Sequence, residues 1–118
     1  MLTALIDYES GNLHSALKAF EKISSENSLG SVTITNDPEI ISNADRLVLP
    51  GDGAFPACKA ALEKSEVFEA LKHAVLAKRR PFLGICVGMQ LMAKKGFEFE
   101  PTNGLNWING QVERIQLD

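Results

Sequence analysis

Cysteine and long apolar runs are both scarce in this sequence. Two cysteines among 118 residues are too few for a disulfide framework, so we treat Cys58 and Cys86 as separate thiols in a reducing compartment. The longest apolar runs, residues 47–49 and 82–87, have the length of strands. Because a membrane-spanning helix needs roughly 20 apolar residues, no such helix is predicted.

An excess of charge of one sign and a secretion signal are also missing. The net charge is −3, and acidic and basic residues are interspersed along the chain. Nucleic acids and anionic membranes are therefore not expected partners. The N-terminus lacks the basic stretch, apolar segment and small-residue cleavage site of a secretory signal. We expect a cytoplasmic protein.

The composition, in contrast, is typical of a single globular domain, with 45% hydrophobic and 23% charged residues. Residues 2–6 are apolar and residues 32–35 are β-branched, so both segments favour strands. Residues 13–23 repeat apolar side chains at helical spacing after Asn12, a residue type that caps helices. The further predicted elements are helices over residues 38–43, 57–64, 66–78 and 88–95 and strands over residues 46–49 and 81–85.

This alternation of strands and helices predicts an α/β fold in which a mainly parallel sheet has helices on both faces, a three-layer sandwich. The crossovers between its parallel strands should be right-handed. Beyond Gly96 the pattern changes to loops and short strands, with residues 101–104 as a turn and residues 111–117 alternating in polarity.

The most informative short segment is Gly84-Ile85-Cys86-Val87-Gly88, which follows a predicted strand and precedes a predicted helix. Small flanking residues allow the sharp turn of a nucleophile elbow, with cysteine as the nucleophile. The unpaired N–H groups at a helix start stabilise a thiolate. The Val87 N–H would point to where an oxyanion forms during attack on a carbonyl.

The same five residues also fit a turn that serves only packing or phosphate binding. A second loop, Pro50-Gly51-Asp52-Gly53, supports the catalytic interpretation because it ends the preceding strand. Loops at the carboxyl ends of parallel strands face one crevice, so this loop and the elbow should lie together. Its glycine-rich backbone could supply a second oxyanion donor, although alone it fits an ordinary tight turn.

Three segments, residues 6–13, 49–55 and 81–91, together closely resemble the glutaminase subunits of imidazole glycerol phosphate synthases, which are class I glutamine amidotransferases of histidine biosynthesis. The resemblance covers essentially the whole chain and implies their flavodoxin-like three-layer fold. The sequence differs from the family at two positions: Glu9 stands where glycine is common, and Asp52 replaces an apolar residue of the oxyanion loop. We expect the first to be a tolerated surface change and the second to affect how the loop N–H turns.

By that resemblance, Cys86 attacks the carboxamide of glutamine, and water later releases glutamate. Backbone N–H groups of Val87 and of the Gly51-Asp52 segment would form the oxyanion hole, and Gln90 would help to hold the substrate. The resemblance implies no cofactor and no metal. The implied partner is a (β/α)8-barrel synthase subunit, which receives the ammonia in a heterodimer.

In the resembling family, the base is a histidine oriented by a glutamate, both in a C-terminal segment that would lie beyond Asp118. We interpret His14 and His73 as ordinary helical residues. We therefore expect residues 1–118 to be the N-terminal part of a single amidotransferase domain, C-terminally incomplete, with little or no turnover alone. Exposed sheet edge and apolar surface should favour self-association of this fragment.

Other interpretations remain open from the residues alone. One is a different class I amidotransferase or a cysteine-elbow hydrolase with another substrate. Another is a non-catalytic module that keeps the fold and docks on a synthase.

Overall fold

Four parallel strands form the larger of two sheets in the computed structural model, which describes residues 1–117. They are β1 (Leu2–Ile6), β2 (Ser31–Thr35), β3 (Arg46–Leu49) and β4 (Phe82–Gly84), in the order β2-β1-β3-β4. The chain thus runs from β1 to its neighbour β2, and then crosses to β3, which lies on the other side of β1. This order confirms the predicted parallel α/β sheet.

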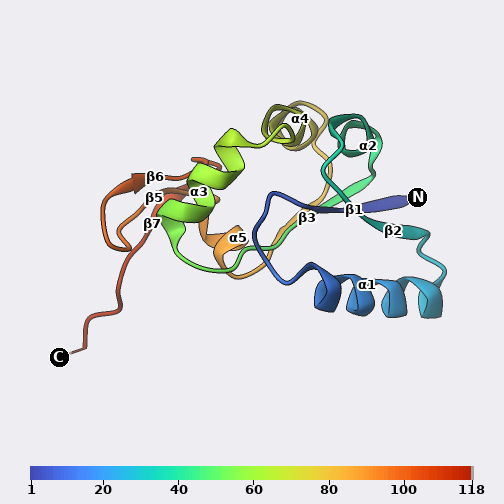
Figure 1. The fold of residues 1–118 in the computed structure, drawn as a ribbon, viewed down its shortest axis with the longest axis horizontal. Helices are drawn as coiled ribbons and strands as arrows, with labels where there is room; N and C mark the ends of the chain where they lie inside the picture. Colours follow the sequence, from blue (N-terminus) through green and yellow to red (C-terminus); the bar gives the residue numbers. More distant parts are fainter. Residues whose placement is uncertain (118) are drawn as a thin grey trace.

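Helices cover both faces of this sheet (Figure 1). Helix α1 (Leu13–Asn27) lies on one face, and α2 (Pro38–Asn43) and α4 (Phe68–Lys72) lie on the other. Asn12 caps α1 as predicted, because its Oδ1 accepts a hydrogen bond from Ser15 N–H at 3.3 Å. The three-layer arrangement is therefore confirmed.

The segment predicted as one helix over residues 66–78 is interrupted. After α4 the chain widens into a π-helical turn, η1 (His73–Ala77), and Lys78 N–H donates to the carbonyl of His73. Widened turns of this kind have no simple signature in apolar spacing, so the sequence pattern predicted only a continuous helix.

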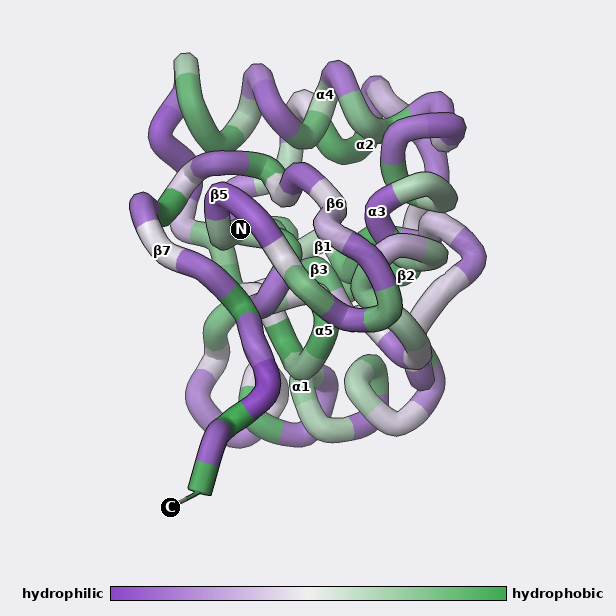
Figure 2. The backbone as a smooth tube through the Cα atoms, turned by 90° about the vertical axis from the view of Figure 1, so that its left-hand side faces the viewer, coloured by the Kyte–Doolittle hydropathy of each residue, from purple (hydrophilic) through white to green (hydrophobic). Residues whose placement is uncertain are grey.

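The core lies between the sheet and the helices α2, α3 (Phe55–Lys64) and α4. Figure 2 shows apolar residues along the central strands and a mixture of polar and apolar residues along the outer parts of the chain. Strands β1 and β3 are buried along nearly their whole length, as parallel strands covered on both faces should be. The core side chains that are fully buried include Leu5, Ile6, Tyr8, Ile41, Leu47, Leu49, Phe55, Leu62 and Leu71.

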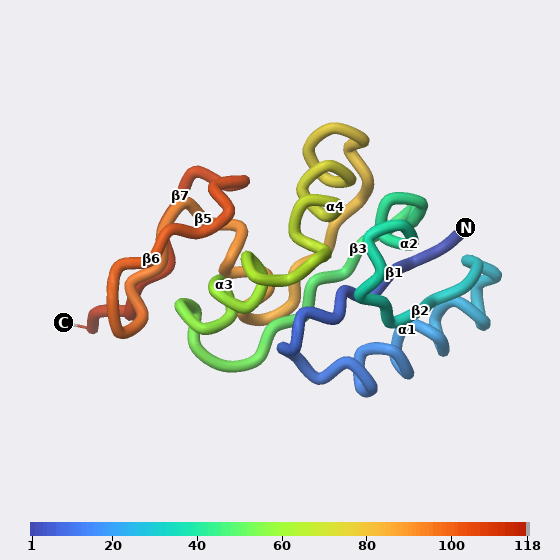
Figure 3. The backbone as a smooth tube through the Cα atoms, turned by 45° about the horizontal axis from the view of Figure 1, so that its top comes forward, coloured from blue at the N-terminus to red at the C-terminus, as the bar shows by residue number. Residues whose placement is uncertain are grey.

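A second sheet follows the elbow and lies beside α3 at one end of the molecule (Figure 1, Figure 3). Its strands are β5 (Ala93–Gly96), β6 (Thr102–Asn103) and β7 (Ile108–Val112), in the order β6-β5-β7. Strand β5 is antiparallel to β6 and parallel to β7. Of residues 111–117, whose polarity alternates, only the first two lie in a strand, since β7 ends at Val112.

The helix predicted over residues 88–95 was also wrong. Helix α5 (Val87–Gln90) is a single turn, and strand β5 begins at Ala93. In a continued helix the Leu91 carbonyl would accept from residue 95, but here it accepts from Leu105 N–H at 2.7 Å. A partner distant in sequence therefore takes the hydrogen bond that would have extended the helix.

Among residues 1–117, no helix is both long enough and apolar enough to span a membrane.

Candidate active site

The register of β3 and β4 brings the two predicted functional loops together. Leu49 lies opposite Gly84, so the loop that begins at Pro50 and the elbow that begins at Ile85 leave neighbouring strands at the same edge. Ile85 N–H donates to the Leu49 carbonyl at 3.0 Å, which joins the two segments directly. The predicted proximity of loop and elbow is thus observed.

The backbone at Cys86 has the strained geometry of a nucleophile elbow. Its φ of 57° and ψ of −122° lie outside the regions that ordinary residues favour. Such a conformation costs on the order of 1–3 kcal/mol and tends to occur at functional sites. The Cys86 side chain is exposed, whereas Cys58 is buried. Of the two thiols, Cys86 is therefore the one that a substrate can reach.

Glycines are required around the elbow because backbone atoms approach closely there. A Cβ on Gly84 would lie 2.6 Å from the Met89 Cα, and a Cβ on Gly88 would lie 1.9 Å from the Leu49 oxygen. Gly51, in the facing loop, would place its Cβ 2.5 Å from the Gly88 nitrogen. Loop and elbow thus pack main chain against main chain, with no space for side chains between them.

A cleft of about 560 Å³ opens beside Cys86. Its lining comes from the elbow, from the 50–52 loop and from the N-terminal half of α1 with the preceding Asn12. The contribution of α1 was not predicted, since nothing in the helical spacing shows which loop a helix will face. The lining residues are Asn12, Ser15, Ala16, Ala19, Phe20, Pro50, Gly51, Asp52, Ile85 and Cys86.

Three backbone N–H groups near Cys86 were predicted as oxyanion donors, and they differ in their partners. Within the described residues, the N–H groups of Val87 and Gly51 have no hydrogen-bond acceptor, although both residues are buried. Buried amides are rarely left unpaired, so an acceptor supplied by a ligand would suit both. The Asp52 N–H instead donates to Ser10 Oγ at 3.0 Å.

The Ser10 side chain forms a small network with the loop. Its hydroxyl donates to the Asp52 carbonyl at 3.0 Å and lies 3.2 Å from the buried Cys58 thiol. Cys58 is thus a packed thiol as its helical context suggests, and it also contacts the loop. Glu9, just before Ser10, is exposed and has a φ of 69°, a conformation that glycine adopts more easily than glutamate.

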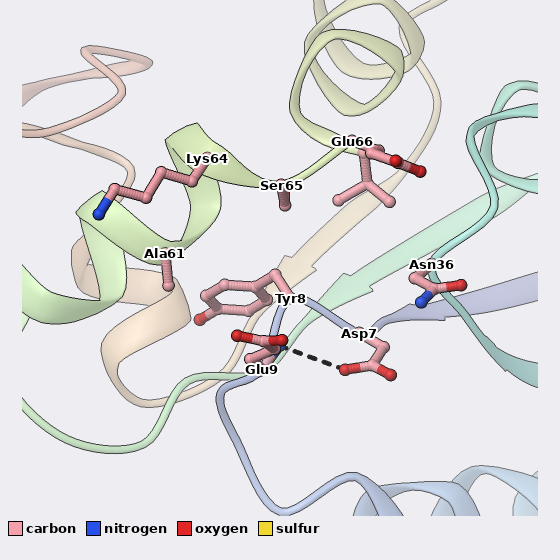
Figure 4. A pocket seen from close by; sticks show the side chains of 9 residues that line it. Asp7, Tyr8, Glu9, Asn36, Ala61, Lys64, Ser65 and Glu66 are labelled. Carbon is pink, nitrogen blue, oxygen red and sulfur yellow. Dashed lines mark hydrogen bonds between the residues drawn. The ribbon is translucent and has the colours of Figure 1, made fainter.

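A second cavity, of about 270 Å³, lies at the carboxyl ends of β1 and β2 and shares no lining residue with the Cys86 cleft. Figure 4 shows its polar wall, with Asp7 and Asn36 following the two strands and the Tyr8 ring lying beside Ala61 of α3. Glu9 N–H donates to Asp7 Oδ1 at 3.2 Å.

Gln90 is not brought to the Cys86 cleft. It is half-buried on α5 and lines a different hollow together with Phe97 and Phe99. His14 and His73 are exposed helical residues, and neither lines the cleft. Within residues 1–117, no three histidine, cysteine or acidic side chains gather in a way that could hold a metal ion.

A comparison with known families identifies the family of this elbow. A model of the family "Glutamine amidotransferase class-I" matches residues 4–98, which include the loop and the elbow. The chain belongs to the class I glutamine amidotransferases. The amidotransferase family thereby confirms the enzyme class that the three sequence segments predicted.

Curated relatives of this amidotransferase chain carry a narrower name. Proteins from Ruegeria pomeroyi, Cereibacter sphaeroides and Caulobacter vibrioides, each named imidazole glycerol phosphate synthase subunit HisH, are 60%, 55% and 49% identical to it. The matches cover 98%, 98% and 96% of this chain and 55%, 55% and 54% of the relatives. The chain thus spans about half the length of these relatives.

Proposed function

We propose that this chain carries the nucleophile of a glutaminase that supplies ammonia to the other subunit of an imidazole glycerol phosphate synthase in histidine biosynthesis. The names of the three relatives support this pathway. In the proposed assembly the other subunit is a (β/α)8-barrel synthase, and the two form a heterodimer. The observation that carries the chemistry is the exposed Cys86 on its strained turn, beside two N–H groups that have no acceptor among residues 1–117.

In the proposed reaction, Cys86 Sγ forms a bond to the side-chain carbonyl carbon of glutamine. The carbonyl oxygen becomes an oxyanion, which the N–H groups of Val87 and Gly51 are free to receive. The C–N bond breaks as the nitrogen takes a proton from a general acid and leaves as ammonia. Water then cleaves the thioester, which gives glutamate and restores the thiol.

The contribution of Asp52 to the oxyanion hole has a geometric condition. Because its N–H donates to Ser10 Oγ, it can reach an oxyanion only after that bond breaks and the Gly51–Asp52 peptide turns. Gln90 remains a proposed substrate contact. It lines a hollow separate from the Cys86 cleft, so either α5 must move or the substrate must extend from the cleft into that hollow.

The test uses a chimeric protein with the full length of a relative. Residues 1–118 replace the matching segment of the Ruegeria pomeroyi relative, and this graft is assayed with that relative's synthase partner for glutamine-dependent glutamate formation. Cys86→Ser should abolish turnover, whereas the matched control Cys58→Ser should retain most of it, because only Cys86 is exposed in the cleft. Full turnover in Cys86→Ser would refute the proposed function.

The 118-residue chain is assayed in parallel without the grafted part. We expect little or no glutamate formation from it, because neither of its histidines lines the cleft as a base for Cys86. Turnover equal to that of the graft would show that these residues suffice for catalysis.

A further inference from the structure

Tyr8 lies between the core and the 50–53 loop and holds the first peptide group of that loop. Its hydroxyl donates a hydrogen bond to the Pro50 carbonyl at 2.6 Å, across 42 residues of sequence. The Tyr8 side chain is 2% exposed and packs in the same apolar cluster as Leu49, Phe55 and Val87. A side chain fixed in this way offers its hydroxyl at one defined place.

The bond to Pro50 also fixes the direction of the next N–H group. The Pro50 carbonyl and the Gly51 N–H belong to one planar trans peptide, so they point in opposite directions and turn together. The Gly51 N–H has no acceptor within the described residues. Holding the Pro50 oxygen against the core therefore aims this free donor away from the core.

Gly51 lies close to both the Tyr8 hydroxyl and the elbow. A Cβ on Gly51 would lie 2.9 Å from Tyr8 Oη and also 2.5 Å from the Gly88 nitrogen. The Tyr8 ring reaches this point from the second cavity, where it lies beside Ala61 of α3 (Figure 4). Tyr8 thus connects the packing of α3 with the position of the loop beside Cys86.

We propose that Tyr8 is a positioning residue for glutamine hydrolysis, whose hydroxyl holds the Pro50–Gly51 peptide in register with the Cys86 elbow. This inference rests on the proposed function. Tyr8 does not line the cleft beside Cys86, so its effect on the reaction passes through the loop. Burial raises the pKa of Tyr8 to about 12, so the hydroxyl keeps its proton and remains a donor at neutral pH.

The test compares Tyr8→Phe with Ser65→Ala in the graft and its synthase partner. Tyr8→Phe keeps the ring in the core and removes only the hydroxyl. Ser65→Ala is the matched control, because Ser65 Oγ also donates to a backbone carbonyl, that of Leu62 at 2.7 Å, but makes no contact with the loop.

We expect Tyr8→Phe to lower kcat about tenfold, less than the loss of a whole oxyanion donor, while KM changes less than twofold. Alkylation of Cys86 by iodoacetamide forms no oxyanion, so its rate should stay the same. Ser65→Ala should leave all three quantities unchanged.

Two results would overturn the role of Tyr8. One is an unchanged kcat in Tyr8→Phe. The other is a parallel fall in kcat and in the alkylation rate, which would show a general disturbance of the elbow. If Cys86→Ser abolishes turnover while Tyr8→Phe behaves as wild type, only the Tyr8 inference fails. If Cys86→Ser keeps turnover, the proposed function itself fails and the inference falls with it.

Discussion

Raising the pH should reveal how tightly Tyr8 is held, because it is the only tyrosine of the chain. Burial is the main cause that raises its pKa from 10.0 to about 12 in the folded state. Since the folded pKa lies above the unfolded one, the linked stabilisation is complete below pH 10 and is lost as the pH rises toward 12. A shift of this size corresponds to about 2–3 kcal/mol of unfolding free energy.

The assay is a spectrophotometric titration of the tyrosinate band, which reports on Tyr8 alone. The native chain should titrate about two pH units above the same chain in urea. Urea unfolding of wild type and Tyr8→Phe is then compared across this pH range. Groups other than Tyr8 titrate in both proteins, so their effects cancel in this comparison. The difference in unfolding free energy should shrink as the pH rises, because only wild type loses the stabilisation that is linked to the Tyr8 proton. Coincident titration curves in native and urea-unfolded chain would refute the reasoning, since the hydroxyl could then be neither buried nor held by Pro50.

Two further substitutions test contacts that hold the site and its surroundings. Gly88→Ala would place a Cβ 1.9 Å from the Leu49 oxygen, whereas ordinary contacts begin at 3.4 Å, so elbow and loop must separate by about 1.5 Å. We expect urea unfolding to show that Gly88→Ala lowers the free energy of unfolding by about 2–4 kcal/mol. The control Gly110→Ala should lower it by less than about 0.5 kcal/mol, because its Cβ meets nothing within 4 Å. Equal stabilities of the two variants would contradict the close packing. Lys59→Met should cost about 1–2 kcal/mol and speed hydrogen exchange in β6, because Lys59 Nζ donates to the Asn103 carbonyl at 2.9 Å. Unchanged exchange there would show that this bond does not hold the strand.

Elements with strong local signals could be predicted from the sequence. Strand Leu2–Ile6, helix Pro38–Asn43 and strand Arg46–Leu49 have the predicted bounds. For the helix, the reason is visible: Asp37 accepts a hydrogen bond from Glu39 N–H at 2.9 Å, and Pro38 occupies the first turn. The elbow around Cys86 was predictable because two glycines flank a nucleophile between a strand and a helix, which is a local pattern, although the contact of Gly88 with Leu49 is long-range.

Features that depend on distant partners could not be predicted in this way. After α5 the Leu91 carbonyl accepts a hydrogen bond from Leu105 N–H, and the apolar pattern of residues 88–95 contains no sign of that partner. The hydrogen bonds from Tyr8 to Pro50 and from Asp52 N–H to Ser10 each span 42 residues. Which loop a polar side chain will reach depends on strand order and register, and helix or strand periodicity specifies neither.

The meeting of Gly51 and Gly88 through main-chain atoms has a consequence for how such a site changes during evolution. Donors that belong to the peptide backbone are present for every encoded amino acid except proline, so most point mutations can displace them but cannot delete them. The Asp52 side chain is exposed and lies outside this contact. Substitutions at that position, other than to proline, therefore leave the N–H groups of Gly51 and Val87 in place, and what they can change is how the Gly51–Asp52 peptide turns.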